Sequence, residues 1–150
     1  MDAVQMLTDD HSKVKDLFKE YEEAGENAHQ KKRGIVEKVF QDLEVHTKLE
    51  EEIFYPAYRS KADEEGQDLL RESLEEHHVV DVLMAEMKRL KPDNPEHEAK
   101  FKVLMENVKH HAEEEEKEMF PNARKKLRDE LDSLGDRMER RKGELLAATR

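Results

Sequence analysis

Apolar residues recur at steps of three and four over four long stretches of the chain, the spacing that forms one face of an α-helix. The stretches cover about residues 4–24, 28–60, 64–90 and 96–126. A Gly-Glu-Asn turn follows the first, and the sequence Lys-Pro-Asp-Asn-Pro over residues 91–95 interrupts the chain before the last. Helices of this length with short connections predict an all-α protein, an up-down-up-down four-helix bundle.

Two prolines lie near helix ends, Pro56 in the second stretch and Pro121 in the fourth, where we expect them to bend or close the helix. The bundle itself is predicted to comprise residues 1–130. Residues 131–150 form a short basic segment, expected to be an extra helix or a tail against the bundle. Its pattern favours a solvated helix over an element that binds a partner.

Charged residues make up 43% of the chain and hydrophobic residues 35%, which would suit a disordered protein if the apolar periodicity were missing. The net charge of −11 argues against nucleic-acid binding. The chain has neither an apolar run long enough to span a membrane nor a signal peptide, so we expect a cytoplasmic protein without membrane contact. Because it lacks cysteine, any bound metal must be held by histidines and carboxylates.

Residues able to bind a metal interrupt the apolar stripes at positions where valine or leucine would otherwise stand. These residues are His11, His46, Glu50, His77, His111 and Glu115. Burying such groups is costly unless they are paired or coordinated, and no Lys or Arg falls on the stripes at the same level. Hydrogen-bonded core histidines and surface His–Glu pairs would explain each residue singly. The joint pattern instead predicts a buried metal site.

An internal repeat supports this interpretation. His46-x-x-x-Glu50 leads to Pro56 in the same way that His111-x-x-x-Glu115 leads to Pro121, so that in both copies the proline follows the histidine by ten residues. A lone histidine precedes each pair, 35 residues earlier at position 11 and 34 earlier at position 77. Two helical hairpins that each supply one histidine and one His–Glu pair suit two metal ions bridged by the carboxylates.

The register of the stripes separates these residues from their polar neighbours. Continuing the stripe through His110 selects a mostly polar face, so His111 is the inward residue, and the same test favours His77 over His78. Glu51 and Glu52 are expected to be solvated. Four imidazoles and two carboxylates suit iron, manganese or zinc, and the histidine-rich set favours iron.

At these residues the sequence resembles the hemerythrin-like (HHE cation-binding) family over about residues 4–125. The motifs that carry the resemblance are His11, His46-x-x-x-Glu50 before Ile-Phe-Tyr-Pro, His77, and His111-x-x-x-Glu115 before Met-Phe-Pro. The resemblance implies a non-haem di-iron centre with an oxo or hydroxo bridge between two Fe ions. It further implies that the two glutamates bridge the irons and that the four histidines are terminal ligands.

The chain departs from the oxygen-carrying hemerythrins, which have a His-x-x-x-His pair on the third helix and an aspartate five residues after the fourth-helix histidine. Here Asp81 stands four residues after His77, and Glu115 replaces the aspartate. One histidine ligand is therefore missing, which argues against reversible oxygen carriage. The open position could hold water, peroxide or a side chain, and Tyr55, Tyr58 and Asp81 are candidates for an additional ligand or a supporting contact.

Three functions are compatible with such a site. The first is a redox-active di-iron protein that binds or reacts with O2, hydrogen peroxide or nitric oxide in oxidative or nitrosative stress protection, including a catalase-like reaction. The second is a non-catalytic module for iron or oxygen sensing or for iron storage, and the third is a structural zinc bundle. No catalytic residue beyond the metal ligands is predicted, and the sequence identifies no protein partner.

Overall fold

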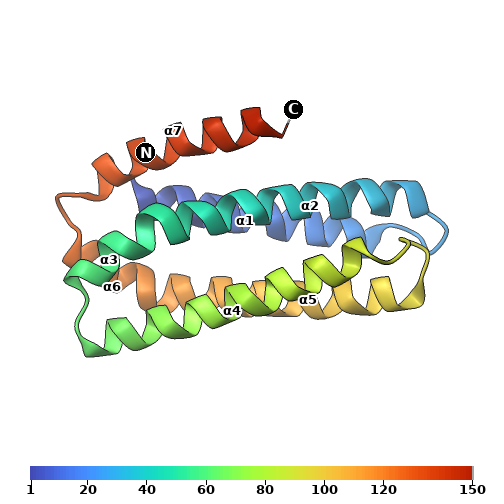
Figure 1. Ribbon diagram of the computed structural model, residues 1–150, viewed down its shortest axis with the longest axis horizontal. Helices are drawn as coiled ribbons and strands as arrows, with labels where there is room; N and C mark the ends of the chain where they lie inside the picture. The colour runs from blue at the N-terminus through green and yellow to red at the C-terminus, as the bar shows by residue number, and fades with distance from the viewer. Residues whose placement is uncertain (150) are drawn as a thin grey trace.

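The computed structural model describes residues 1–149, and Arg150 lies outside the described residues. Every regular element in residues 1–149 is helical, which confirms the all-α prediction. Four long helices lie along the longest axis of the molecule, with α1 and α2 joined at the same end as α4 and α5 (Figure 1). The helices are α1 (Ala3–Glu23), α2 (His29–Leu49), α3 (Tyr55–Lys61), α4 (Glu64–Lys88), α5 (Pro95–Glu114), α6 (Phe120–Lys126) and α7 (Leu131–Ala148).

Side-chain caps set three of the helix starts. The carboxylates of Asp2 and Asp63 and the side chain of Asn94 accept hydrogen bonds from backbone N–H groups in the first turns of α1, α4 and α5. Such caps satisfy N–H groups that have no partner within the helix. They explain why the starts fall within one residue of the positions predicted from the apolar pattern.

Neither proline ends its helix, because α3 and α6 continue past Pro56 and Pro121. The expectation that the prolines close their helices is therefore wrong. Each follows a five-residue π-helical turn, η1 (Glu50–Phe54) before Pro56 and η2 (Glu115–Met119) before Pro121. A proline has no N–H, and its ring crowds the carbonyl of the preceding turn. The helix widens instead of breaking, so that Tyr55 N–H bonds to the carbonyl of Glu50. Both π turns begin at a glutamate that the sequence assigns to the metal site.

The apolar core consists of two clusters, and the predicted metal ligands lie between them along each helix. On α1, Leu7 belongs to one cluster and Val14 to the other, with His11 between them. On α2, Leu43 and Leu49 flank His46 in the same way. The packing on both sides of the polar layer holds the four long helices at a fixed separation.

Helix α7 packs against α1 and α2 on the outside of the four long helices (Figure 1). Its inner face is buried through Leu134, Met138 and Leu145, so α7 is joined to the core along one side. At Gly135 a Cβ would lie 2.1 Å from the carbonyl oxygen of Met1, so this close approach requires glycine. No helix within residues 1–149 is long and apolar enough to cross a membrane.

Candidate metal centre

The six residues predicted as metal ligands are all buried and converge in the middle of the bundle. Glu50 and Glu115 are 0% and 1% exposed, and the four histidines are nearly as inaccessible. The donor atoms of His11, His46, Glu50 and Glu115 lie within 4.8 Å of one another, and those of Glu50, His77 and His111 form a second such group. Helices α1, α2, α4 and α5 and both π turns therefore contribute to one site.

The histidines form two pairs, each with ring centroids 5.0 Å apart: His11 with His46, and His77 with His111. Each pair joins a lone histidine to the paired histidine of the same hairpin. The arrangement has the twofold character that the sequence repeat predicts. Each pair belongs to one of the two groups of donor atoms that could hold a metal ion.

Both carboxylates lie between the two histidine pairs. Oε1 of Glu50 is 3.2 Å from Nε2 of His46 and 3.1 Å from Nε2 of His77. Oε1 of Glu115 is 3.1 Å from Nε2 of His11 and 3.3 Å from Nε2 of His111. Each glutamate thus faces one imidazole from each histidine pair.

Behind each histidine a further carboxylate accepts a hydrogen bond from Nδ1. These contacts join His11 to Glu116 at 3.0 Å, His46 to Asp10 at 3.0 Å, His77 to Glu51 at 2.7 Å and His111 to Glu76 at 2.6 Å. Such partners fix the ring orientation and leave Nε2 free to face the centre. All four imidazoles therefore point their Nε2 atoms inward.

The four supporting carboxylates were missed by the sequence analysis, which expected Glu51 to be solvated. The repeat contains their signal. Asp10 and Glu76 each precede a lone histidine and support the paired histidine of their own hairpin, whereas Glu51 and Glu116 each follow a paired glutamate and support the lone histidine of the other hairpin. Matched carboxylates at matched positions could have been recognised as a second layer of the site.

Tyr55 reaches the centre and Tyr58 does not. The Tyr55 hydroxyl donates a hydrogen bond to Oε2 of Glu115 at 2.6 Å and lies 3.3 Å from Nε2 of His77. The Tyr58 hydroxyl instead donates to Asn122. Asp81 is exposed and does not belong to the converging groups.

The site has two halves, one around the pair of His11 and His46 and the other around the pair of His77 and His111. They differ at the residue before each proline. Tyr55 stacks on His77 with ring centroids 5.4 Å apart, and Phe120 stacks on His11 at 5.7 Å. Because Tyr55 and Phe120 occupy matching places after the two π turns, only the half with His77 has a phenol beside it.

Charges in the centre are strongly coupled. Burial lowers the pKa of His46, but the charge of Glu50 and the hydrogen bond to Asp10 raise it to about 10. For His111, burial is likewise outweighed by the charge of Glu115, which with the hydrogen bond to Glu76 raises the pKa to about 11. Burial raises the pKa of Glu115, yet the charge of His111 brings it well below its usual range. The carboxylates thus favour positive charge on His46 and His111, which a bound cation would replace.

Polar atoms that face the centre are left without hydrogen bonds, and this tests whether the residues fit a metal. Among the described residues, the atoms without a partner are Nε2 of His11, His46 and His111, Oε2 of Glu50 and Oε1 of Glu115. Several of these atoms lie close to one another, but they are not oriented so that one donates a hydrogen bond to the other. Orphaned polar atoms in a native core are costly. Nitrogen and oxygen donors aimed at shared points suit divalent or trivalent metal ions, so the residues fit the group.

Next to the histidines lies a cavity of about 30 Å³, bordered on its apolar side by Val14, Leu43, Val80 and Val108. One water molecule needs roughly 10–15 Å³ of such space. The cavity therefore suits a molecule of two heavy atoms and is far smaller than the pockets that bind organic substrates.

The fold and the site define a helical bundle with a buried set of imidazoles and carboxylates that could hold a metal ion. The chain belongs to the hemerythrin HHE cation-binding domain family, whose model matches residues 2–123. A crystal structure of a hemerythrin HHE cation-binding domain-containing protein from Mycobacterium kansasii has the same fold, with a TM-score of 0.80 and 22% sequence identity. That match covers 99% of this chain and 89% of the other.

Relatives identified by sequence are uncharacterised or considerably longer. Uncharacterised proteins of Mycobacterium tuberculosis and Mycobacterium bovis are 28% identical over 143 residues, which cover 94% of this chain and 85% of theirs. A DNA nickase of Nostoc sp. is 29% identical over 130 residues, 87% of this chain. The match spans 36% of the length of the nickase.

Proposed function

We propose that this protein holds a non-haem di-iron centre and uses it to react with a small oxidant: O2, hydrogen peroxide or nitric oxide. The observation that carries the proposal is the set of inward-facing imidazole and carboxylate atoms that have no hydrogen-bond partner among the described residues. Two iron ions, when bound, would supply the electron exchange. We further propose that the fold carrying this centre is an up-down-up-down four-helix bundle, to which α7 is added as an extra helix.

In this proposal the chain's residues hold and shield the centre. Glu50 and Glu115 would hold both metal ions, because each faces both histidine pairs. The four histidines would be terminal ligands, kept in one orientation by their supporting carboxylates. Tyr55 is the candidate for a ligand beside His77, since its oxygen lies among the donor atoms of that half.

The size of the cavity and the charge of the protein support small reactants. A space of about 30 Å³ beside the histidines admits peroxide or a diatomic gas and excludes organic substrates. The net charge of −11 opposes binding to a nucleic-acid backbone, so we do not extend the nickase activity of the Nostoc relative to this chain.

The test is to load purified protein with Fe²⁺ without oxygen, measure bound iron, and then add hydrogen peroxide while recording O2. A catalase-like reaction converts two peroxide molecules into two water molecules and one O2, so one O2 should appear for every two peroxides consumed. Binding of two irons per chain without peroxide turnover would favour the alternative, a non-catalytic iron or oxygen sensor or an iron store. Failure to bind iron, or selective retention of zinc, would overturn the proposal.

A further inference from the structure

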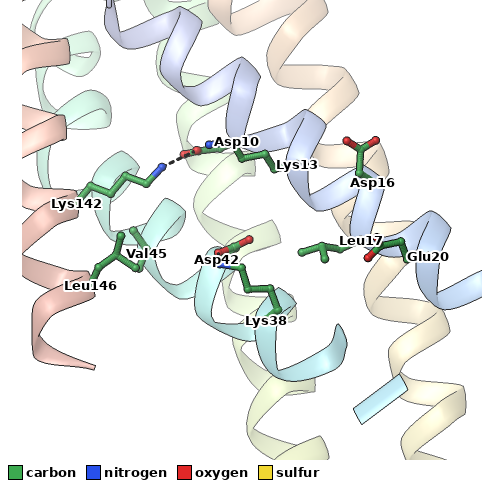
Figure 2. A pocket seen from close by; sticks show the side chains of 10 residues that line it. All are labelled: Asp10, Lys13, Asp16, Leu17, Glu20, Lys38, Asp42, Val45, Lys142 and Leu146. Carbon is green, nitrogen blue, oxygen red and sulfur yellow. Dashed lines mark hydrogen bonds and ion pairs between the residues drawn. The ribbon is translucent and has the colours of Figure 1, made fainter. Parts of the chain in front are cut away.

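Helix α7 contacts the metal centre through a chain of two hydrogen-bonded ion pairs. Nζ of Lys142 donates to Oδ1 of Asp10 at 3.1 Å, and Oδ2 of Asp10 accepts from Nδ1 of His46 at 3.0 Å. Figure 2 shows Lys142 extending from α7 to Asp10 on α1. The His46 ring in turn directs Nε2 toward Glu50.

We propose that Lys142 is a positioning residue for His46, acting through Asp10; this inference rests on the proposed metal centre. An aspartate that accepts a single hydrogen bond can still turn about its side-chain bonds. Here the two oxygens of Asp10 are divided between Lys142 and His46, so the plane of the carboxylate is fixed from both sides. The direction of the His46 ring is thereby tied to α7.

This arrangement distinguishes Asp10 from the other supporting carboxylates. Lys15 lies 3.8 Å from Glu116, but it approaches the same oxygen that accepts from His11, and it comes from the same helix as His11. Within residues 1–149, neither Glu51 nor Glu76 forms an ion pair with a lysine or arginine. Lys142 therefore acts on one histidine of one half, the half formed by His11 and His46.

The packing of α7 fixes the position of the backbone from which the Lys142 side chain extends. Buried Met138 and Leu145 flank it in sequence, and Leu146 lies with Val45 beneath the lysine in a groove of about 400 Å³ between α1, α2 and α7 (Figure 2). The side chain of Lys142 is 29% exposed, and that of Asp10 is 12% exposed. Water is thus partly excluded from the pair, which strengthens the charge-assisted hydrogen bond.

Arg141 provides a matched control, because this neighbouring cation holds α7 without touching Asp10. Its guanidinium donates to Oε1 of Glu52 at 3.0 Å, on the exposed side of η1. Arg141→Met and Lys142→Met each remove one cation from α7 and one ion pair to the rest of the bundle. Only the lysine variant releases the Asp10 carboxylate.

The experiment titrates the full-length metal-free protein with Co²⁺ and follows its visible absorption, which reports the ligand geometry of each ion. We expect Lys142→Met to weaken one of the two binding steps by about tenfold, the lower end for loss of a ligand-orienting partner, and to alter the spectrum of that ion. Lys142→Arg should restore the affinity of that binding step and the wild-type absorption spectrum. Arg141→Met should bind Co²⁺ as the wild type does. We expect its melting temperature to shift in the same direction as that of Lys142→Met, because each variant loses one ion pair between α7 and the rest of the bundle.

Three outcomes decide the matter. A change in one binding step confined to Lys142→Met, with rescue by arginine, supports the positioning role. Two unchanged steps in Lys142→Met, or equal changes in Arg141→Met, overturn it while leaving the metal centre intact. Absence of Co²⁺ and Fe²⁺ binding in the wild type overturns both this inference and the proposed function. If Lys142→Met does not fold, Lys142→Gln in the same titration gives the same decision.

Discussion

The hydroxyl of Tyr55 donates a hydrogen bond of 2.6 Å to Oε2 of Glu115, a glutamate 60 residues later in the chain. This contact joins the first residue of α3, in one hairpin, to the π turn η2 of the other. Burial and the charges of Glu115 and Glu50 raise the pKa of Tyr55 well above its ordinary value, so the phenol keeps its proton unless a cation displaces it.

The first prediction concerns this phenol as a metal ligand. If Tyr55 binds ferric iron, the iron-loaded protein should be coloured by charge transfer from the phenolate, and Tyr55→Phe should abolish that absorption while retaining two irons. Tyr58→Phe is the control, because the Tyr58 hydroxyl is directed to Asn122. An unchanged spectrum in Tyr55→Phe would remove Tyr55 from the ligand set.

If Glu50 bridges the two irons, removal of its charge should reduce the amount of bound iron. Glu50→Gln keeps the size of the side chain but removes the charge that both histidine pairs share, so bound iron should fall from two ions per chain to one or none. Iron is measured after gel filtration, with Glu52→Gln as the control because Glu52 pairs with Arg141 outside the centre. Retention of both irons by Glu50→Gln would contradict the bridging assignment.

Two supporting carboxylates at matched positions should affect opposite halves of the site. Glu51→Gln replaces the charged acceptor for Nδ1 of His77 with a neutral amide, and Glu116→Gln does the same for His11. Each should weaken one metal-binding step by about 10–100-fold, and each serves as the control for the other. Because Tyr55 stacks on His77, the phenolate absorption should change in Glu51→Gln and persist in Glu116→Gln. Equal effects of both variants on that absorption would refute the division into halves.

The shifted pKa values predict opposite pH dependences for metal-free folding and for metal binding. The pKa of His46 is raised from 6.5 to about 10, so its protonation stabilises the metal-free fold fully below about pH 6.5, and this contribution is lost as the pH rises toward 10. Metal binding must release that proton. The rise in melting temperature caused by Co²⁺ should therefore increase between about pH 6 and 8.5. If the rise in melting temperature caused by Co²⁺ is independent of pH, metal binding does not release the His46 proton and the prediction is wrong.

A pair of glycines on α7 tests the packing of this helix. Gly135→Ala would place a Cβ 2.1 Å from the carbonyl oxygen of Met1, and we expect a loss of about 1–3 kcal/mol in unfolding free energy. Gly143→Ala has no atom within 4 Å of the new Cβ and should be stabilising by about 0.5–1 kcal/mol, because alanine suits a helix interior better than glycine. Denaturant unfolding measures the change in unfolding free energy of each variant. Equal changes in the two variants would contradict the close approach of α7 to the start of the chain.

Much of the fold follows from local patterns. The helix starts are fixed by apolar spacing and by capping side chains, both of which act within a few residues, and α1, α4 and α5 begin within one residue of their predicted starts. The prolines show where such reasoning fails. The local pattern allows Pro56 to bend or to close its helix, and closure is wrong: packing of the chain on both sides favours a widened turn that leads into α3 over a break.

The sequence by itself determined the four amphipathic helices and the six inward-facing imidazole and carboxylate side chains, because a polar residue on an apolar stripe is visible from helical periodicity alone. Tertiary structure decided which carboxylates support the histidines, since Glu51 and Glu116 reach across to helices of the other hairpin. It also decided the place of Tyr55, because a π turn shifts the residues after Glu50 out of the α-helical register. The contact between Lys142 and Asp10, separated by 132 residues, depends on the packing of α7.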